Sequence, residues 1–194
     1  MPIASATTAS AYAEDQQLVG EILQKDRKAT AEFVDRYSGP VYGFVRRRLA
    51  YRPEAVEDVV QEVFLAAWRT LGHYRGNSAL LTWLLGIARH KVDDHHRQRA
   101  RECAWPEHED AHELASEPLA ETDLDRDTAL RRINDTLVGL PEHYSLVLVL
   151  RYIEERPLRA IAELLGKTEK SVERTLARAR EQFRERWTNA GQRS

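Results

Sequence analysis

The chain has 194 residues and a mass of 22.3 kDa, enough for two small domains with modest cores. Its single cysteine, Cys103, excludes an internal disulfide and fits a reducing cytoplasm. No apolar run reaches the roughly 18–20 residues needed to span a bilayer, and the N-terminus lacks the basic-then-apolar pattern of a signal peptide. We therefore expect a cytoplasmic protein without a membrane span.

The charged residues are unevenly distributed along the chain. The formal net charge is −2 at pH 7, but residues 1–101 carry 15 Lys and Arg against 12 Asp and Glu, residues 102–127 carry 1 against 10, and residues 128–194 carry 13 against 9. No stretch alternates between apolar and polar residues with the period of two that is typical of strands. The sequence therefore predicts an all-α fold, with two small helical domains joined by a flexible acidic linker.

The N-terminal part is predicted to contain a leader and two helices. Residues 1–13 are small and polar, which is typical of a disordered leader. A short amphipathic helix begins at Asp15 and ends near Lys25. A second helix begins near Ala29 and is predicted to be interrupted by the Ser-Gly-Pro sequence at residues 38–40, because proline lacks the N–H that a helix interior uses.

A further helix is predicted from Pro53, a residue suited to the first helical position. One face, within residues 56–67, is apolar and is expected to pack in a core. A neighbouring face, called the mixed face below, places large apolar residues beside carboxylates; it consists of Asp58, Gln61, Glu62, Leu65 and Trp68. Leu65 and Trp68 either touch a neighbouring helix of the same domain or form an intermolecular docking face, and the residues alone leave both interpretations open.

The loop at residues 72–78 combines an aromatic ring with hydrogen-bond donors, namely Tyr74, Arg75 and Asn77. Such a loop is usually only a turn. A ring for stacking and donors for a base edge are, however, also what a pocket for an unstacked base requires. Ser78 is predicted to cap the helix that follows.

That next helix is predicted to be buried along one side and basic at its far end. Its apolar stripe lies within residues 80–88, and Lys91, Arg97 and Arg101 follow. Their charges suit contact with nucleic-acid phosphates, although Asp93 and Arg97 could equally form a solvated pair one turn apart.

The acidic linker, residues 102–127, has two prolines and little periodicity. Fully extended it would reach about 85–90 Å. That length lets two DNA-reading domains bind sites two helical turns apart, on the order of 70 Å. Cys103, His108 and His112 lack a fourth ligand and a scaffold, so no metal site is expected there.

The C-terminal part is predicted to contain a helix-turn-helix. Pro157 opens one helix, and Gly166 ends it shortly before a last helix. A helix, a glycine-containing turn and a second helix are typical of this DNA-binding motif. Lys170, Arg174 and Arg178 are expected to point away from the apolar stripe of the last helix, as a recognition helix in the major groove requires. A plain solvated face is the alternative.

Several long segments resemble one known family. The segments VEDVVQEVFLAAW at residues 56–68, YRGNSALLTWLLGIAR at 74–89 and DHHRQRAR at 94–101 resemble region two of the extracytoplasmic-function sigma factors, which are small promoter-specificity subunits of bacterial RNA polymerase. The segment LPEHYSLVLVLRYIEERPLRAIAELLGKTEKSVERTLARARE at residues 140–181 is similar to region four of the same family.

The resemblance implies two domains with different partners. A region-two domain, residues 14–101, would bind core RNA polymerase at the clamp of its largest subunit through the mixed face. A region-four domain, residues 128–188, would contact the flap of the second-largest subunit.

The resemblance also implies two DNA-binding sites. The residues implied to recognise and melt the minus-ten element are Tyr74, Arg75, Asn77, Ser78, Lys91, Arg97 and Arg101. The residues implied to recognise the minus-thirty-five element are Arg159, Lys170, Ser171, Glu173, Arg174 and Arg178. Glu173 stands where the family commonly has Lys.

The function implied by the resemblance is promoter-specific transcription initiation by binding alone, without catalysis, cofactor or metal. Capture of flipped bases would offset the cost of unstacking them. An anti-sigma protein is implied as the regulator, and the factor is expected in the cytoplasm, either free or held at the membrane by that protein. Two alternatives are a stand-alone helix-turn-helix regulator that never touches polymerase, and an enzyme that uses His90, His95 and His96 with Asp93 and Asp94.

Overall fold

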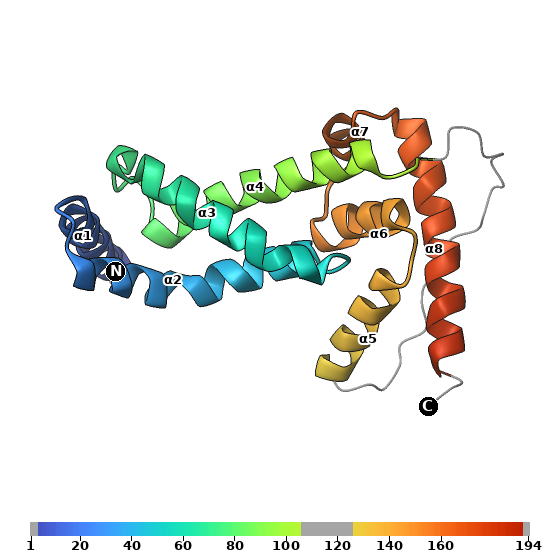
Figure 1. Ribbon diagram of the computed structural model, residues 1–194, viewed down its shortest axis with the longest axis horizontal. Coiled ribbons are helices and arrows are strands. Elements are labelled where there is room, and N and C mark those ends of the chain that lie inside the picture. Colours follow the sequence, from blue (N-terminus) through green and yellow to red (C-terminus); the bar gives the residue numbers. More distant parts are fainter. Residues whose placement is uncertain (1–3, 106–125, 192–194) are drawn as a thin grey trace. The chain divides into compact units, whose positions relative to one another are not determined.

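The computed structural model describes residues 4–105 and 126–191, and every regular element in these two ranges is helical (Figure 1). The all-α fold expected from the sequence is therefore confirmed. The helices are α1 (Ala4–Leu23), α2 (Arg27–Arg48), α3 (Val56–Thr70), α4 (Leu80–Glu102), α5 (Arg126–Val138), α6 (Glu142–Leu148), α7 (Leu158–Leu165) and α8 (Glu169–Gly191). Two 3-10 turns (Pro53–Ala55 and Leu71–His73) flank α3, and a π-helical segment (Val149–Ile153) follows α6.

The chain divides into two compact units. Unit 1 consists of Met1–Arg46 and Glu54–Val92, and unit 2 consists of Arg47–Pro53 and Asp93–Ser194. Helix α4 contributes its first part to unit 1 and its remainder to unit 2. The predicted domain limits rest on sequence likeness and stay predictions, and most of the predicted linker, with His108 and His112, lies outside the described residues.

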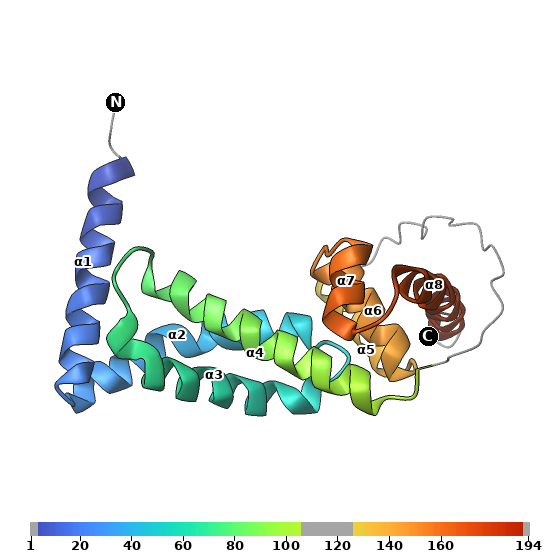
Figure 2. The same ribbon diagram turned by 90° about the horizontal axis from the view of Figure 1, so that it is seen from above.

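Unit 1 is built on the apolar stripes of three long helices that lie alongside one another, with α1 across their end (Figure 2). Spacings of three and four residues put each stripe on one side of its helix. The buried residues of these stripes are Phe33, Tyr37, Val41 and Val45 on α2, Val56, Val59, Val63 and Ala67 on α3, and Leu80, Leu84, Ala88 and Val92 on α4. The stripes predicted on α3 and α4 are thus confirmed in their main positions.

Helix α2 is continuous, so the predicted interruption at residues 38–40 is wrong. Pro40 lies inside the helix with its ring exposed. A proline in a helix interior costs about 3 kcal/mol. The helix persists because its buried stripe continues through the proline, from Phe33 and Tyr37 to Val41 and Val45.

The N-terminus also differs from the expectation. The structure describes residues 4–13 as the first part of α1 rather than as a disordered leader. The physical reason is composition: this segment is rich in alanine, the residue with the highest helix propensity, and contains no Gly or Pro.

Unit 2 contains the helix-turn-helix. Residues 144–150, which run from α6 into the start of the π-helical segment, are all buried, as the apolar run at residues 146–150 predicts. Helix α7 ends at Gly166, whose φ of 65° is the left-handed conformation of a helix C-cap. Leu130 on α5 is 51% exposed.

No helix within residues 4–105 and 126–191 combines the length and the apolar character that crossing a membrane requires.

Candidate functional surfaces

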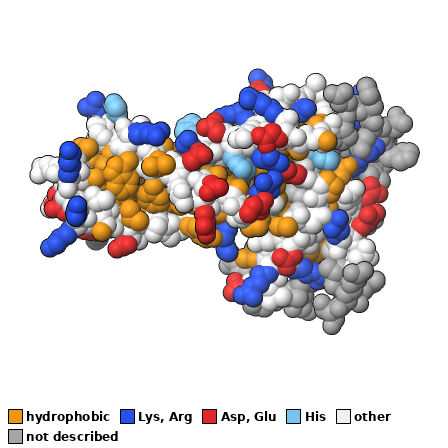
Figure 3. Space-filling model, in the orientation of Figure 1, with side chains coloured by type: hydrophobic (Ala, Val, Ile, Leu, Met, Phe, Trp, Pro, Cys, Tyr) orange, Lys and Arg blue, Asp and Glu red, His pale blue; other side chains and the backbone are white. Residues whose placement is uncertain are grey.

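The mixed face of α3 is largely open to solvent. Leu65 is 57% exposed and Trp68 is 40% exposed, whereas Val63 and Ala67, on the other side of the helix, are fully buried. The Trp68 ring meets the ring of Phe33 edge-on, with 5.5 Å between centroids. Trp68 therefore does touch a neighbouring helix of its own unit, while Leu65 is left exposed. The space-filling view shows hydrophobic side chains gathered over α2 and α3 (Figure 3).

An ion pair links the mixed face to α4. Lys91 Nζ lies 3.2 Å from Glu62 Oε2, and the Glu62 side chain is 58% exposed. The pair brings together a residue predicted to bind polymerase and one predicted to bind the minus-ten element. Such exposed pairs contribute little to stability. Both partners are therefore available for other contacts at small cost.

The loop between α3 and α4 is held by its own aromatic residue. The Tyr74 hydroxyl donates a hydrogen bond to the carbonyl oxygen of Ser78 at 2.6 Å. Its ring packs against Trp83 with 5.6 Å between centroids. Arg75 and Asn77, in the same loop, are exposed. The loop thus presents two donor side chains on a fixed backbone.

The predicted capping role of Ser78 is not what the structure shows. The backbone N–H of Leu80, the first residue of α4, donates to Asp15 Oδ2 at 2.7 Å. Asp15 lies on α1, and its carboxylate satisfies an N–H that has no partner inside the helix. Its other oxygen accepts from the Tyr37 hydroxyl at 2.9 Å. Burial, together with this hydrogen bond to Asp15, raises the pKa of Tyr37 to about 12.

The basic end of α4 has different pairs from those expected. Arg97 pairs with Asp94, not with Asp93, and the Arg97 side chain is 41% exposed. Asp93 instead accepts a hydrogen bond from Arg156. Arg101 is exposed. Arg97 and Arg101 therefore keep access to solvent, as phosphate contacts would require.

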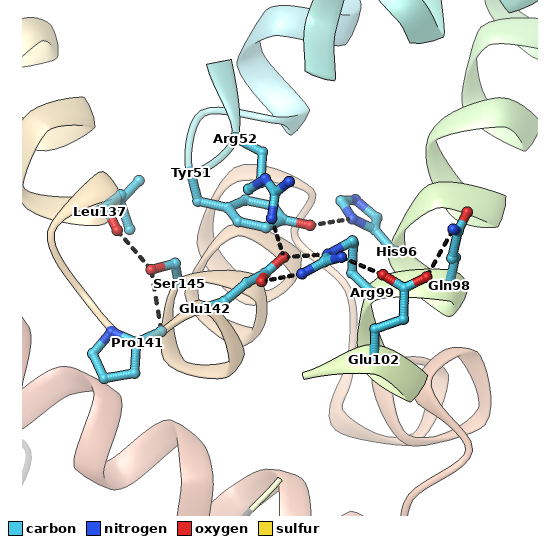
Figure 4. A network of polar contacts seen from close by, with 10 residues as sticks. All are labelled: Tyr51, Arg52, His96, Gln98, Arg99, Glu102, Leu137, Pro141, Glu142 and Ser145. Carbon is cyan, nitrogen blue, oxygen red and sulfur yellow. Dashed lines mark hydrogen bonds and ion pairs between the residues drawn. The ribbon is translucent and has the colours of Figure 1, made fainter. Parts of the chain in front are cut away.

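A network of charged groups joins the end of α4 to α6 within unit 2 (Figure 4). Arg99 Nε and Nη2 donate to the two carboxylate oxygens of Glu142, each at 2.6 Å. Arg52 Nη1 donates to the same carboxylate at 3.2 Å. The hydrogen bonds from Arg99 lower the pKa of Glu142 below its usual value. Paired, partly buried charges of this kind stabilise the unit only while both partners are ionised.

His96, one of the histidines named in the enzyme alternative, is fully buried. Its Nε2 lies 3.0 Å from Glu154 Oε1, and its Nδ1 lies 3.1 Å from the Tyr51 hydroxyl. Burial would raise the pKa of Glu154, but the hydrogen bond from His96 and the charge of Arg156 outweigh it and lower that pKa. Because an ionised carboxylate can only accept, His96 donates from Nε2.

Both ring nitrogens of His96 are therefore engaged inside the protein. A histidine so bound has no lone pair left for a metal or a substrate. Within the described ranges, no group of His, Cys, Asp or Glu side chains could hold a metal ion. His96 is therefore not available for the chemistry that the enzyme alternative assigned to it.

The predicted minus-thirty-five residues lie on α7 and α8. Lys170 and Glu173 are exposed, and Ser171, Arg174 and Arg178 are half-buried. The Arg159 side chain is 79% exposed and pairs with Glu163 one turn on. The Nε atom of Arg174 is buried and finds no hydrogen-bond partner in the described part of the chain. The outward basic face expected of a recognition helix is thus present, although not all of it is fully exposed.

One neighbour of this face was not expected from the sequence. The indole N–H of Trp105 donates to Ser171 Oγ at 3.4 Å. Lys167 Nζ lies 5.2 Å from the centre of the same ring. Ser171 lies in the first turn of α8, and its backbone N–H donates a hydrogen bond to Thr168 Oγ1 at 3.1 Å. Trp105 therefore packs on the start of the predicted recognition helix.

Comparison with known proteins assigns each half of the chain to a known domain family. The model of the Sigma-70 region 2 family matches residues 33–102, and the model of Sigma-70, region 4 matches residues 130–183. The RNA polymerase sigma-H factor of Pseudomonas aeruginosa is 32% identical over 176 residues, which is 87% of this chain and 91% of that protein. The ECF RNA polymerase sigma-E factor of Haemophilus influenzae is 31% identical over 176 residues, which is 86% of this chain and 92% of that protein.

A solved structure of CnrH in complex with the cytosolic domain of CnrY is 25% identical, with a TM-score of 0.40, and the match covers 88% of this chain and 95% of that chain. The family models and the two relatives together establish the identity. The chain belongs to the extracytoplasmic-function family of RNA polymerase sigma factors, which bind core polymerase and promoter DNA and direct transcription initiation.

Proposed function

We propose that this sigma factor binds the clamp of the largest polymerase subunit through the mixed face of α3. The observation that carries the proposal is the exposure of Leu65, 57%, on a helix whose opposite side is fully buried. Leu65 is a large apolar side chain that lies in water beside carboxylates. Its burial by a partner lowers the free energy of the complex. The neighbouring Asp58, Gln61 and Glu62 would supply the polar rim of that interface.

The minus-ten element would be opened by the region-two domain, residues 14–101. A flipped base needs an aromatic face and donors for its edge, and the Tyr74 loop offers both with its backbone already fixed. The site would consist of Tyr74, Arg75, Asn77, Ser78, Lys91, Arg97 and Arg101. The exposed guanidinium groups of Arg97 and Arg101 would neutralise phosphates beside the opened strand.

The minus-thirty-five element would be read by the region-four domain, residues 128–188. Lys170 and Arg159 are exposed and suit phosphate contact. Arg174 is half-buried on α8, and its guanidinium group suits the acceptors of a guanine edge. Glu173 would accept from a cytosine amino group or orient Arg174. The same domain would contact the flap of the second-largest polymerase subunit.

This function needs neither catalysis nor a cofactor, because binding energy alone opens the DNA. We further propose that an anti-sigma protein covers the mixed face when the factor is idle, since exposed apolar residues favour a second partner. The factor would then reside in the cytoplasm, free or held at the membrane by that inhibitor.

The direct test is run-off transcription with bare bacterial core polymerase and a library of genomic fragments, followed by mapping of start sites. We expect transcripts from discrete start sites that share sequences upstream, and only when the protein is present. Equal transcription with and without the protein would contradict the proposal. A matched reaction with the Leu65→Asp variant, which keeps the DNA-binding residues, should lose those transcripts.

A further inference from the structure

Asp15 of α1 lies at a junction of three helices in unit 1. It is only 7% exposed, although it is a carboxylate. Oδ1 accepts from the Tyr37 hydroxyl of α2 at 2.9 Å, and Oδ2 accepts from the first backbone N–H of α4, that of Leu80, at 2.7 Å. A buried carboxylate is costly unless it is hydrogen-bonded, and both oxygens here are. The negative charge also complements the helix dipole at the N-terminus of α4.

The next residue, Gln16, lies against the loop that precedes α4. Its Nε2 is 3.4 Å from the carbonyl oxygen of Arg75. Gly76 has a φ of 70°, and a Cβ built there would lie 2.1 Å from Gln16 Nε2. A side chain at Gly76 would therefore have to displace the end of the Gln16 side chain, and the positive φ itself favours glycine. Together Asp15 and Gln16 hold both the loop and the start of the helix after it.

We propose that α1 is a positioning part of the minus-ten reader: Asp15 fixes the N-terminus of α4, Gln16 fixes the backbone at Arg75 and Gly76, and so the Tyr74 loop is held ready to receive a base. This inference rests on the proposed function of that loop. Asp15 touches no DNA and acts through the residues that it orients. A loop ordered before binding does not lose conformational freedom when it captures a base, so the opened DNA is held more tightly.

The hydrogen bond between Asp15 and the Leu80 N–H also explains why strand opening would be sensitive to a substitution at Asp15. Without the Asp15 carboxylate, the first N–H of α4 loses its partner, and the first turn of the helix is free to fray. The loop then has to be ordered when the base is captured. Binding to core polymerase, which uses α3, and binding to the upstream duplex, which uses α8, do not depend on that step.

The experiment uses the full-length factor, core polymerase and a promoter fragment that the wild-type holoenzyme transcribes in the run-off test above. Asp15→Ala removes both contacts, Asp15→Asn keeps an acceptor for Leu80, and Tyr37→Phe removes only the hydroxyl that bonds the other oxygen. Strand opening is measured by permanganate reactivity of thymines in the minus-ten region. Affinity for core polymerase and for a duplex carrying only the upstream element is measured in parallel, below the unfolding temperature of every variant.

We expect Asp15→Ala to reduce the opened fraction roughly tenfold while both affinities stay within about twofold of wild type. Asp15→Asn should restore most of the opening, and Tyr37→Phe should open as wild type does even if it unfolds at a lower temperature. Wild-type opening by Asp15→Ala would overturn the inference. So would an equal loss of opening, core affinity and upstream affinity, which a merely structural role predicts. If no fragment is transcribed by the wild type, the proposed function fails instead.

Discussion

Arg99 holds both carboxylate oxygens of Glu142, with Nε and Nη2 each 2.6 Å from an oxygen. The two side chains are each 20% exposed. Glu142 is the first residue of α6, where a negative charge also complements the helix dipole. A bidentate pair of this kind is stronger than a single neutral hydrogen bond. It ties the end of α4 to the helices of unit 2.

This pair predicts a pH dependence of stability. The hydrogen bonds from Arg99 lower the pKa of Glu142 in the folded protein, so the unfolded chain binds a proton at Glu142 more readily. The stabilisation is therefore fully present above the unfolded pKa and is lost as pH falls through the lowered folded pKa. We expect Glu142→Gln to reduce the free energy of unfolding by about 1–3 kcal/mol at pH 7, measured in urea.

The difference between Glu142→Gln and wild type should shrink as the pH is lowered toward and below the usual range of a carboxyl group. Glu102→Gln is a matched control, because Glu102 also pairs with Arg99 but its side chain is 45% exposed. That variant should change stability much less. A Glu142→Gln effect that is the same at pH 7 and pH 3 would contradict this account.

The mixed face predicts a variant that folds but does not bind polymerase. Leu65→Ala should leave the free energy of unfolding within about 0.5 kcal/mol of wild type, because the side chain is exposed. It should weaken binding to core polymerase roughly tenfold or more, as the loss of an interface anchor does. Leu23→Ala on α1 is the matched control, since Leu23 is 54% exposed and lies outside the mixed face. Equal affinities of the two variants would exclude the mixed face as the docking site.

The recognition helix predicts two distinguishable defects. Lys170→Ala should weaken binding to all DNA sequences alike and reduce the slope of log affinity against log salt by about 1, because it removes one phosphate contact. Arg174→Ala should instead relax the preference for one base pair, with a loss of about 1–3 kcal/mol on the preferred site only. Titrations of labelled duplexes at several salt concentrations measure both. Lys28→Ala, on exposed surface of α2, should change neither.

The left-handed backbone conformation of Gly166, in the turn of the helix-turn-helix, predicts that a side chain at this position destabilises the protein. A Cβ at Gly166 would meet no atom within 4 Å, so the cost of Gly166→Ala comes from its φ of 65° alone. We expect a loss of about 1–2 kcal/mol in the free energy of unfolding. Gly20→Ala, inside α1 and also in open space, should stabilise the protein by about 0.5–1 kcal/mol. Thermal unfolding of the two variants should therefore shift in opposite directions.

The helices and most core positions could be predicted from the sequence, because apolar periodicity is a local property. The partners of the buried polar residues could not. Asp15 and Leu80 are 65 residues apart, and His96 and Glu154 are 58 apart, so no local pattern shows that they meet. The signal that these residues are buried was nonetheless present in their spacing.

Asp15 stands on the same side of its helix as Leu18, Val19 and Ile22, all of which are buried. His96 likewise continues the four-residue spacing of Ala88 and Val92. A polar residue in register with a buried stripe indicates a buried hydrogen bond. The continuity of α2 through Pro40 could have been inferred in the same way, from a stripe that continues on both sides of the proline.

The central claim is that one chain docks on polymerase and opens promoter DNA at a fixed distance from an upstream duplex site. Its most direct test is permanganate mapping of a transcribed promoter fragment together with protection of the upstream duplex from nuclease. We predict reactive thymines confined to one short segment, about two helical turns downstream of the protected site, that appear only with both the protein and core polymerase. Upstream protection without any opened segment, or opening by core polymerase alone, would contradict the account.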